Sequence, residues 1–223
     1  MTSPAEPVSP GGVRVERVVT SGTFSLDGGT WDVKNNVWLI GDDDEVIVVD
    51  AAHNARAIAN AVGSRRVLAN VLTHAHDDHI DAAGDLYDRL HDDQGPGAIW
   101  LNPGDRMLWH VLYAIEPDRD LDDGTEFTVG DVTVTALHTP GHTPGSTCLY
   151  VPQLGVLFSG DTLFQGGPGA TGRSYSDFPT IVASIRDRLL ILPGDTVVHT
   201  GHGDDTTIGA EAPHLDEWIT RGH

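Results

Sequence analysis

Three histidines and two aspartates are crowded into one short stretch of the chain. Residues 73–79 read Thr-His-Ala-His-Asp-Asp-His and directly follow an apolar run over 67–72. Neutral imidazole nitrogens and carboxylate oxygens are the usual ligands of zinc and related transition metals. The polar first turn of a helix over 78–91 would also explain the aspartates. Three histidines interleaved with them, immediately after an apolar run, favour a metal site.

The apolar run explains how these side chains could converge. Residues 67–72 predict a buried strand, and side chains alternate from one face of a strand to the other. If the extended geometry continues past Leu72, His74 and His76 project to the same side. Asp78 and His79 then lie where the chain turns into the following helix. Chemistry is commonly carried by loops that begin at strand ends, which fits this placement.

Three further segments each end an apolar run with a potential ligand beside a glycine. His142 follows a run over 132–137, Asp161 follows 156–159, and His202 follows 196–199. Taken alone, Asp161 suits a helix cap or turn, and His202 suits an exposed loop. Strand ends at one edge of a sheet meet in space, however, so a convergent site is expected. Seven such ligands would fill two metal sites and leave a position for water.

Composition narrows the classes of protein to which the chain can belong. The 223 residues contain 39% hydrophobic residues, with 13 Lys plus Arg against 33 Asp plus Glu, a formal net charge of −20. This charge disfavours nucleic acid and anionic membranes as partners. The single cysteine, Cys148, excludes an internal disulfide and favours a reducing, cytoplasmic compartment. It lies in a predicted strand, so we expect a buried, unreactive thiol.

The order of elements predicts an α/β fold with two β-sheets flanked by helices. We expect a disordered leader over 1–12 and a single domain over 13–223. The predicted strands are 13–20, 36–40, 46–50, 67–72, 98–101, 126–129, 132–137, 147–151, 156–159 and 196–199. The predicted helices are 54–62, 78–91, 105–115, 178–190 and 211–219.

The seven candidate ligands, in this order and spacing, resemble those of the metallo-β-lactamase-fold hydrolase superfamily. The resemblance spans about residues 13–219 and implies the family's four-layer αβ/βα sandwich. It also implies one metal on His74, His76 and His142, and a second on Asp78, His79 and His202. Asp161 would bridge the two metals. Two Zn²⁺ ions per chain are expected, with iron or manganese as alternatives.

The branch of the superfamily is indicated by shorter motifs. Residues 162–164, 172–174, 177–179 and 206–211 are similar to those of short glyoxalase II-like proteins. That likeness implies hydrolysis of a thioester of a small thiol by a hydroxide that bridges the two metals, with Asp78 as ligand and proton acceptor. Metal lowers the pKa of bound water from about 16 to about 7. The chain ends soon after Ile219, without the helical extension that binds glutathione in longer relatives, so another thiol carrier is plausible.

Other functions stay open at this stage. A persulfide dioxygenase would use one iron held by two histidines and an aspartate, and a lactonase would open lactone rings. A non-catalytic scaffold fits poorly with a complete set of ligand types. The sequence leaves the acyl group and the oligomeric state undetermined.

Four further residues are candidates for supporting roles. Asp50 matches a family position near the site, where a carboxylate orients a ligating imidazole. His138 is expected to hydrogen-bond in the core close by. Arg173 could contact a substrate carboxylate or hold its own loop through an ion pair, and Tyr175 could line the substrate pocket. Among the remaining histidines, His53 is the most interesting, because it follows Asp50 closely.

Overall fold

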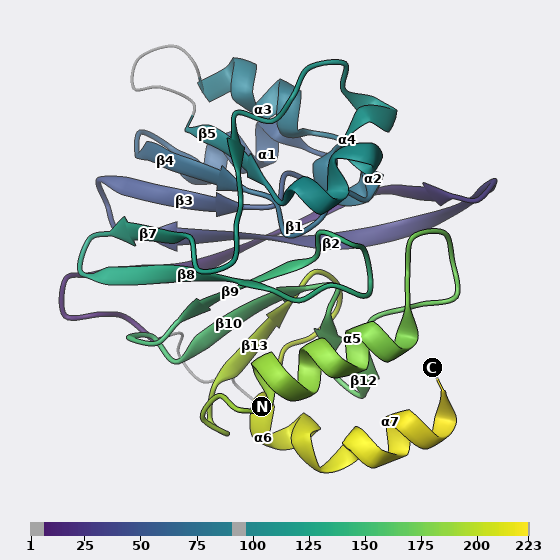
Figure 1. Ribbon diagram of the computed structural model, residues 1–223. Helices are drawn as coiled ribbons and strands as arrows, with labels where there is room; N and C mark the ends of the chain where they lie inside the picture. The colour runs from purple at the N-terminus through teal and green to yellow at the C-terminus, as the bar shows by residue number, and fades with distance from the viewer. Residues whose placement is uncertain (1–6, 91–96, 223) are drawn as a thin grey trace.

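The computed structural model describes residues 7–90 and 97–222, and these residues form two stacked β-sheets with helices on both outer faces (Figure 1). The first sheet has the strand order β1-β2-β3-β4-β5-β6, and the second has the order β14-β13-β10-β9-β8-β7. In the first sheet, β1 to β3 pair antiparallel and β3 to β6 pair parallel. In the second, only the β10–β13 pair is parallel. Both sheets are therefore mixed.

The bounds of the elements are as follows. The first sheet contains β1 (Arg14–Leu26), β2 (Gly29–Gly41), β3 (Glu45–Val49), β4 (Arg66–Val71), β5 (Ala98–Leu101) and β6 (Arg119–Asp120). The second contains β7 (Glu126–Val129), β8 (Val132–His138), β9 (Thr147–Val151), β10 (Val156–Gly160), β13 (Val197–Thr200) and β14 (Thr206–Thr207), and a separate pair is formed by β11 (Leu163–Phe164) and β12 (Gly167–Pro168). The α-helices are α1 (Ala55–Val62), α2 (Asp77–Ile80), α3 (Ala83–Leu90), α4 (Arg106–Leu112), α5 (Phe178–Ser184), α6 (Ile208–Glu211) and α7 (Leu215–Arg221). Short 3-10 turns are η1 (Pro103–Asp105) and η3 (Ala212–His214), and η2 (Ile185–Leu189) is a π-helical segment.

Three hydrophobic cores correspond to the three interfaces between four layers. Along β2, Val37 and Leu39 pack under the helices of the first half, whereas Trp38 and Ile40 point into the space between the sheets. This split follows from the alternation of side chains along a strand, and it requires an apolar run that is buried on both faces. A third core lies between the second sheet and the helices α5 and α7. The predicted αβ/βα sandwich is confirmed.

The first two strands are much longer than expected. The sequence predicted strands over 13–20 and 36–40, but β1 and β2 are paired along their whole length as a hairpin, which extends at the right of Figure 1. Its outer half contains only half-buried and exposed residues, so it lacks the continuous apolar signal. The turn is Asp27-Gly28, and both residues have positive φ (51° and 78°). An Asp-Gly pair between strands is a strong hairpin signal, and it was missed.

The predicted helix 105–115 is shorter, as α4, and the α-helix predicted over 178–190 ends at Ser184 and continues as the π-helical η2. Two other predicted helices are interrupted, for local reasons. The helix predicted over 78–91 is broken into α2 and α3, because the backbone N–H of Ala82 donates to the carbonyl of Ala51 instead of continuing the helix. Residue 91 lies outside the described residues. The helix predicted over 211–219 is also divided, with Pro213 in the turn that precedes α7. Proline at that point has no N–H for an intrahelical bond.

Two predictions about the ends and the cysteine can be compared with the structure. Within the predicted disordered leader, residues 8–11 are attached to the domain. Val8 pairs with Arg14, and Ser9 and Gly11 donate hydrogen bonds to Asp131. Cys148 is fully buried, and burial raises the pKa of its thiol to about 11, as expected of an unreactive residue. Among the described residues, no helix is long and apolar enough to cross a membrane.

Candidate metal centre

The seven predicted ligands lie together at one edge of the two sheets. His74 and His76 follow β4, and Asp78 and His79 lie in α2 immediately after them. The remaining three, His142, Asp161 and His202, come from the loops after β8, β10 and β13. The carboxyl ends of β3 and β4 lie at the same edge of the first sheet because these strands are parallel, and β10 and β13 are parallel in the second. This topology brings side chains that are 128 positions apart in the chain into one cluster.

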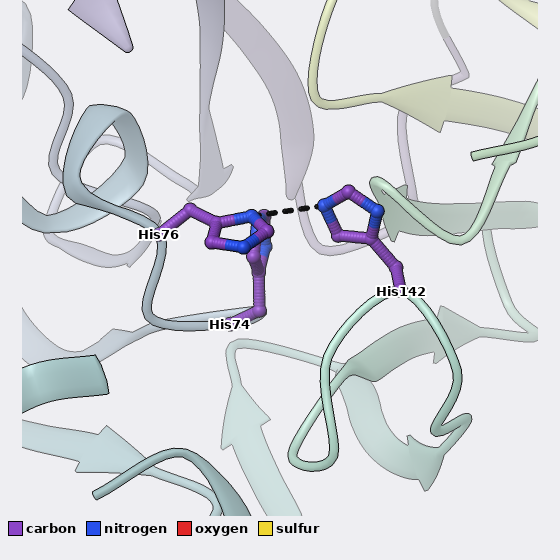
Figure 2. Close-up of side chains that lie close together, drawn as sticks. All are labelled: His74, His76 and His142. Atoms are coloured by element: carbon purple, nitrogen blue, oxygen red, sulfur yellow. Dashed lines mark hydrogen bonds between the residues drawn. The ribbon is translucent and has the colours of Figure 1, made fainter. Parts of the chain in front are cut away.

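Three imidazoles form the first group of this cluster (Figure 2). Nδ1 of His76 lies 3.1 Å from Nε2 of His74 and 3.0 Å from Nε2 of His142. All three side chains are buried. Each ring nitrogen carries either a hydrogen or a lone pair, so Nδ1 of His76 cannot donate a hydrogen bond to one of these neighbours while it accepts one from the other. A cation at their centre would use all three lone pairs.

A second group, of one carboxylate and two imidazoles, lies beside the first. Nε2 of His202 is 3.2 Å from Nε2 of His79 and 3.2 Å from Oδ2 of Asp78. Nε2 of His79 is 3.7 Å from the same carboxylate oxygen. These three residues again offer ligand atoms that lie close enough together to hold one metal ion.

Asp161 lies between the two groups and contacts both. Its Oδ2 is 3.5 Å from Nε2 of His142 in the first group and 3.5 Å from Nε2 of His202 in the second. Its Oδ1 is 3.4 Å from Nε2 of His79. The backbone makes room for this carboxylate at Gly201, where an added Cβ would lie 2.3 Å from Oδ1 of Asp161.

The spacing of these atoms fits transition-metal coordination. Two ligands bound to one tetrahedral zinc at 2.0–2.1 Å are about 3.4 Å apart. The contacts within the two groups range from 3.0 to 3.7 Å. The donor set of imidazoles and carboxylates also suits zinc or iron better than calcium, which prefers oxygen alone. The residues present therefore fit a pair of metal ions.

The outer nitrogens of His142, His202 and His79 are held by partners that orient the rings. Nδ1 of His142 donates to the carbonyl of Ala170 at 2.9 Å, and Nδ1 of His202 donates to the carbonyl of Lys34 at 2.8 Å. These bonds place a hydrogen on Nδ1 of each ring, so that Nε2 faces the centre and is the nitrogen that the neutral ring offers to a metal. His79 is oriented in the same way by Asp50, whose Oδ2 lies 2.8 Å from its Nδ1.

The pKa shifts of histidines in the two groups have opposite directions. Burial, reinforced by the neighbouring imidazoles, lowers the pKa of His76 to about 3 and that of His74 well below its usual range. Burial also opposes protonation of His79 and His202, but the nearby carboxylates outweigh it. They raise the pKa of His202 to about 10 and that of His79 well above its ordinary value. Without metal, His74 and His76 are thus neutral, and the second group is an ion-paired cluster.

A buried carboxylate that the sequence did not single out fastens the loops of the first group. Asp105 accepts hydrogen bonds from the backbone N–H of Ala75 at 3.0 Å, the hydroxyl of Thr143 at 2.7 Å and the backbone N–H of Gly145 at 2.6 Å. It therefore joins the loop after β4 to the loop after β8. In the sequence, Asp105 stands at the start of the predicted helix 105–115, where an aspartate is common, so nothing marked it as a link between these loops.

The four residues predicted to support the site have different surroundings in the structure. Asp50 is buried and lies beside the cluster, as expected. Nε2 of His138 donates to the carbonyl of Pro144 at 2.9 Å, and so supports the loop of His142. The guanidinium of Arg173 lies 4.1 Å from the ring centroid of Trp31 on the hairpin, a cation–π contact that the sequence did not suggest. Tyr175 is 53% exposed and has a positive φ of 71°.

The long hairpin forms a wall beside the cluster. The ring of Phe24 lies 5.2 Å from the ring of His76 and 5.7 Å from that of Trp31. The backbone N–H of Ser25 donates to Asp77, and the tip residue Asp27 accepts two hydrogen bonds from Ser174. Two attachments therefore hold the hairpin next to the seven side chains.

Comparison with known proteins places this geometry in context. The sequence matches the profile of the metallo-beta-lactamase superfamily over residues 30–202. It is 33% identical to the hydroxyacylglutathione hydrolase GloC of Haemophilus influenzae, over 80% of this chain and 90% of that protein. The structure resembles that of the BLEG-1 B3 metallo-beta-lactamase, with a TM-score of 0.73, 31% identity, and coverage of 88% of this chain and 98% of the other. It also resembles TTHA1623 in a di-iron-bound form, with a TM-score of 0.64, 29% identity, and coverage of 92% and 96%.

Proposed function

The chain belongs to the metallo-beta-lactamase superfamily, and on that premise we propose that it is a dinuclear metal hydrolase that cleaves thioesters of a small thiol. The observation that carries the proposal is the position of Asp161 between two complete groups of ligand atoms. In this assignment, His74, His76 and His142 would hold one metal ion, Asp78, His79 and His202 would hold the other, and Asp161 would be a ligand available to both groups.

The metals supply Lewis acidity and a water molecule whose pKa is lowered to about 7 when they are bound. The protein's own side chains orient the ligand groups and accept a proton. Burial opposes ionisation of Asp78, yet His79, His202 and the Asn35 amide lower the pKa of this carboxyl below its ordinary value. Asp78 is therefore ionised at neutral pH and is assigned as ligand and proton acceptor. Zinc is the proposed metal, and iron is the alternative that the di-iron relative suggests.

A thioester is proposed as the substrate for two reasons. The leaving thiolate is a soft ligand that zinc accepts well. The GloC relative, which covers most of this chain, is by name a hydroxyacylglutathione hydrolase. We further propose that Phe24 and Trp31 contact the acyl group, that Arg173 lies over Trp31 at the outer end of the same wall, and that Tyr175 lines the substrate pocket. The proposed compartment is the reducing cytoplasm.

Metal content and activity measured on the same preparation test this proposal. Substrates should include a 2-hydroxyacyl-glutathione, the same acyl group on other small thiols, a lactone, a β-lactam and a persulfide. We expect about two metal ions per chain and hydrolysis of thioesters. One iron per chain, with oxygen uptake on the persulfide, would support a dioxygenase instead, and ring opening alone would support a lactonase. Metal-loaded protein inert on every substrate would point to a non-catalytic scaffold.

A double variant serves as the control for the site itself. His76→Ala with Asp161→Ala removes one ligand from the first group and the proposed bridge. We expect this variant to lose bound metal and hydrolysis together. Metal content equal to that of the unaltered protein would show that the metal is held elsewhere.

A further inference from the structure

A buried chain of hydrogen bonds leads from Asp78 away from the cluster. Nδ2 of Asn35 on β2 donates to Oδ2 of Asp78 at 3.0 Å. The other end of the same amide, Oδ1, lies 2.9 Å from Nε2 of His53. Asn35 is fully buried, and the side chain of His53 is 3% exposed. The order Asp78–Asn35–His53 therefore crosses from α2 through β2 to the loop after β3.

The direction of these bonds follows from the chemistry of the amide. An ionised carboxylate only accepts hydrogen bonds, so the NH₂ group of Asn35 must face Asp78. Its carbonyl oxygen then faces His53 and requires a hydrogen on Nε2. An amide turned by 180° would set two acceptor oxygens against each other at Asp78. The Asp78 carboxylate thus sets which end of Asn35 it meets, and His53 holds the amide in that orientation from its other end.

His53 is held in this position, next to Asn35, by contacts of its own. Its backbone N–H donates to Oδ1 of Asp81 at 2.6 Å, and its Nδ1 lies 3.0 Å from Oδ2 of the same residue. Its φ of +59° is uncommon for a residue other than glycine. On β1, an added Cβ at Gly22 would lie 2.2 Å from Nδ1 of His53, so the ring occupies the space that this glycine leaves.

We propose that His53 and Asn35 are positioning residues for Asp78, and that they strengthen metal binding by the Asp78–His79–His202 group. The inference rests on the metal-binding roles assigned under the proposed function. Asn35 restrains the rotation of the Asp78 carboxylate, and His53 restrains Asn35. The first group, His74, His76 and His142, receives none of these contacts, so only one of the two metals depends on them.

Two substitutions at position 53 distinguish the orientation of Asn35 from a purely structural link between two elements. The Nε2 of a glutamine can take the place of the ring Nε2, so His53→Gln keeps a donor for Asn35. The shorter His53→Asn keeps a donor near Asp81 but cannot reach Asn35. Asparagine also tolerates positive φ well, so His53→Asn costs the backbone little. If His53 only linked β2 to the end of α2, the two variants should have the same effect, because each keeps one of the two contacts and loses the other.

Stepwise Co²⁺ titration of the metal-free chain, in competition with a chromophoric chelator, measures each metal site separately. We expect His53→Asn and Asn35→Ala to weaken the second site about 10- to 100-fold, the usual effect of removing an outer partner of a ligand. The first site should be unchanged, and His53→Gln should restore most of the lost affinity. Equal affinities in all variants, or equal weakening of both sites, would overturn the inference.

A measurement without metal tests the hydrogen bonds themselves. In long-range ¹⁵N–¹H spectra of the metal-free chain, Nε2 of His53 should carry a hydrogen, and its signal should shift in Asn35→Ala. An unprotonated Nε2 would overturn the positioning role even in a protein that binds two metals. If His53 shows the expected hydrogen but the unaltered chain binds no metal through the Asp78 group, the proposed function fails and the inference fails with it.

Discussion

Oδ2 of Asp50 lies 2.8 Å from Nδ1 of His79, and both side chains are buried at the edge where the two sheets meet. Asp50 also accepts hydrogen bonds from the backbone N–H and the hydroxyl of Thr73, at 2.8 and 3.0 Å. One carboxylate thus ties the end of β3 to the start of the metal-binding stretch and to its last histidine. A ligating imidazole whose other nitrogen is bound to a carboxylate is fixed in orientation and is made more basic.

Asp50→Asn should weaken the second metal site while the fold is retained. The amide can still accept from Thr73, and asparagine tolerates the φ of +65° at this position. The negative charge that orients His79 is lost, so we expect about 10- to 100-fold weaker binding of one metal of the two. Metal titration with a chelator measures this. Unchanged affinity for both metals would show that Asp50 serves only the backbone of Thr73.

Gly201→Ala tests the cluster without removing any polar group. The added methyl would lie 2.3 Å from Oδ1 of Asp161 and 2.8 Å from Cε1 of His79, so one of these side chains must move. We expect loss of at least one bound metal and a large loss of hydrolysis. Gly194→Ala is the matched control, because its added Cβ meets nothing closer than 3.6 Å. Full metal content in Gly201→Ala would contradict the geometry of the site.

Metal binding should release protons at neutral pH, and unevenly between the two groups. Metals bind neutral imidazole. Carboxylates raise the pKa of His202 to about 10 and that of His79 well above its ordinary value, against the effect of burial. These rings carry protons at pH 7 and must lose them, whereas His76, with a pKa of about 3, has none to lose. Calorimetry in two buffers of different ionisation enthalpy should show about two protons released at the second group and fewer at the first, where His74 and His76 have none to lose.

The metal-free chain should be most stable near pH 6.5. The lowered pKa of His76, about 3, means that the unfolded chain binds more protons below pH 6.5, so stability falls from there towards pH 3. The raised pKa of His202, about 10, means that its contribution is complete below pH 6.5 and is lost as the pH rises towards 10. Urea unfolding with a chelator present, from pH 4 to 10, measures this. A midpoint that rises steadily across the range would contradict these two shifts.

Asp105→Asn should lower the stability of the domain. The buried carboxylate accepts from Ala75, Thr143 and Gly145, and an amide can accept only at its oxygen while it turns an N–H towards another donor. We expect a loss of about 2–3 kcal/mol in the free energy of unfolding. The control is Asp88→Asn at an exposed position of α3, where the change should be within about 0.5 kcal/mol. An effect of Asp105→Asn no larger than that control would show that the two loops hold without the carboxylate.

The local signals in the chain were strongest where burial is continuous. The runs before His74, Asp161 and His202 are mostly apolar and are buried on both faces of their strands, so their type and approximate bounds could be predicted. The outer half of the β1–β2 hairpin contains only half-buried and exposed residues and was not predicted. Its Asp27-Gly28 turn, with two positive φ angles, was the signal that could have identified it.

The residues that support the cluster were harder to predict than the candidate ligands. Asp105, Asn35 and Asp81 are ordinary polar residues in sequence, with no spacing that marks them. Each becomes meaningful through a partner far along the chain: Asp105 through Thr143, Asn35 through Asp78, and Asp81 through His53. A hydrogen bond between residues that are distant in sequence does not change the pattern of polar and apolar residues in either segment, so that pattern cannot predict it.

The sequence by itself determined which ligand chemistry is present and that each candidate ligand follows a strand, because residue type and hydrophobic alternation are local properties. The tertiary structure decided how the seven divide into two groups with Asp161 between them, since that depends on which strand ends share an edge of the stacked sheets. It also decided which partner orients each imidazole and brought the hairpin beside His76. Those relations are distances between segments far apart in the chain, and only the packing of the two sheets sets them.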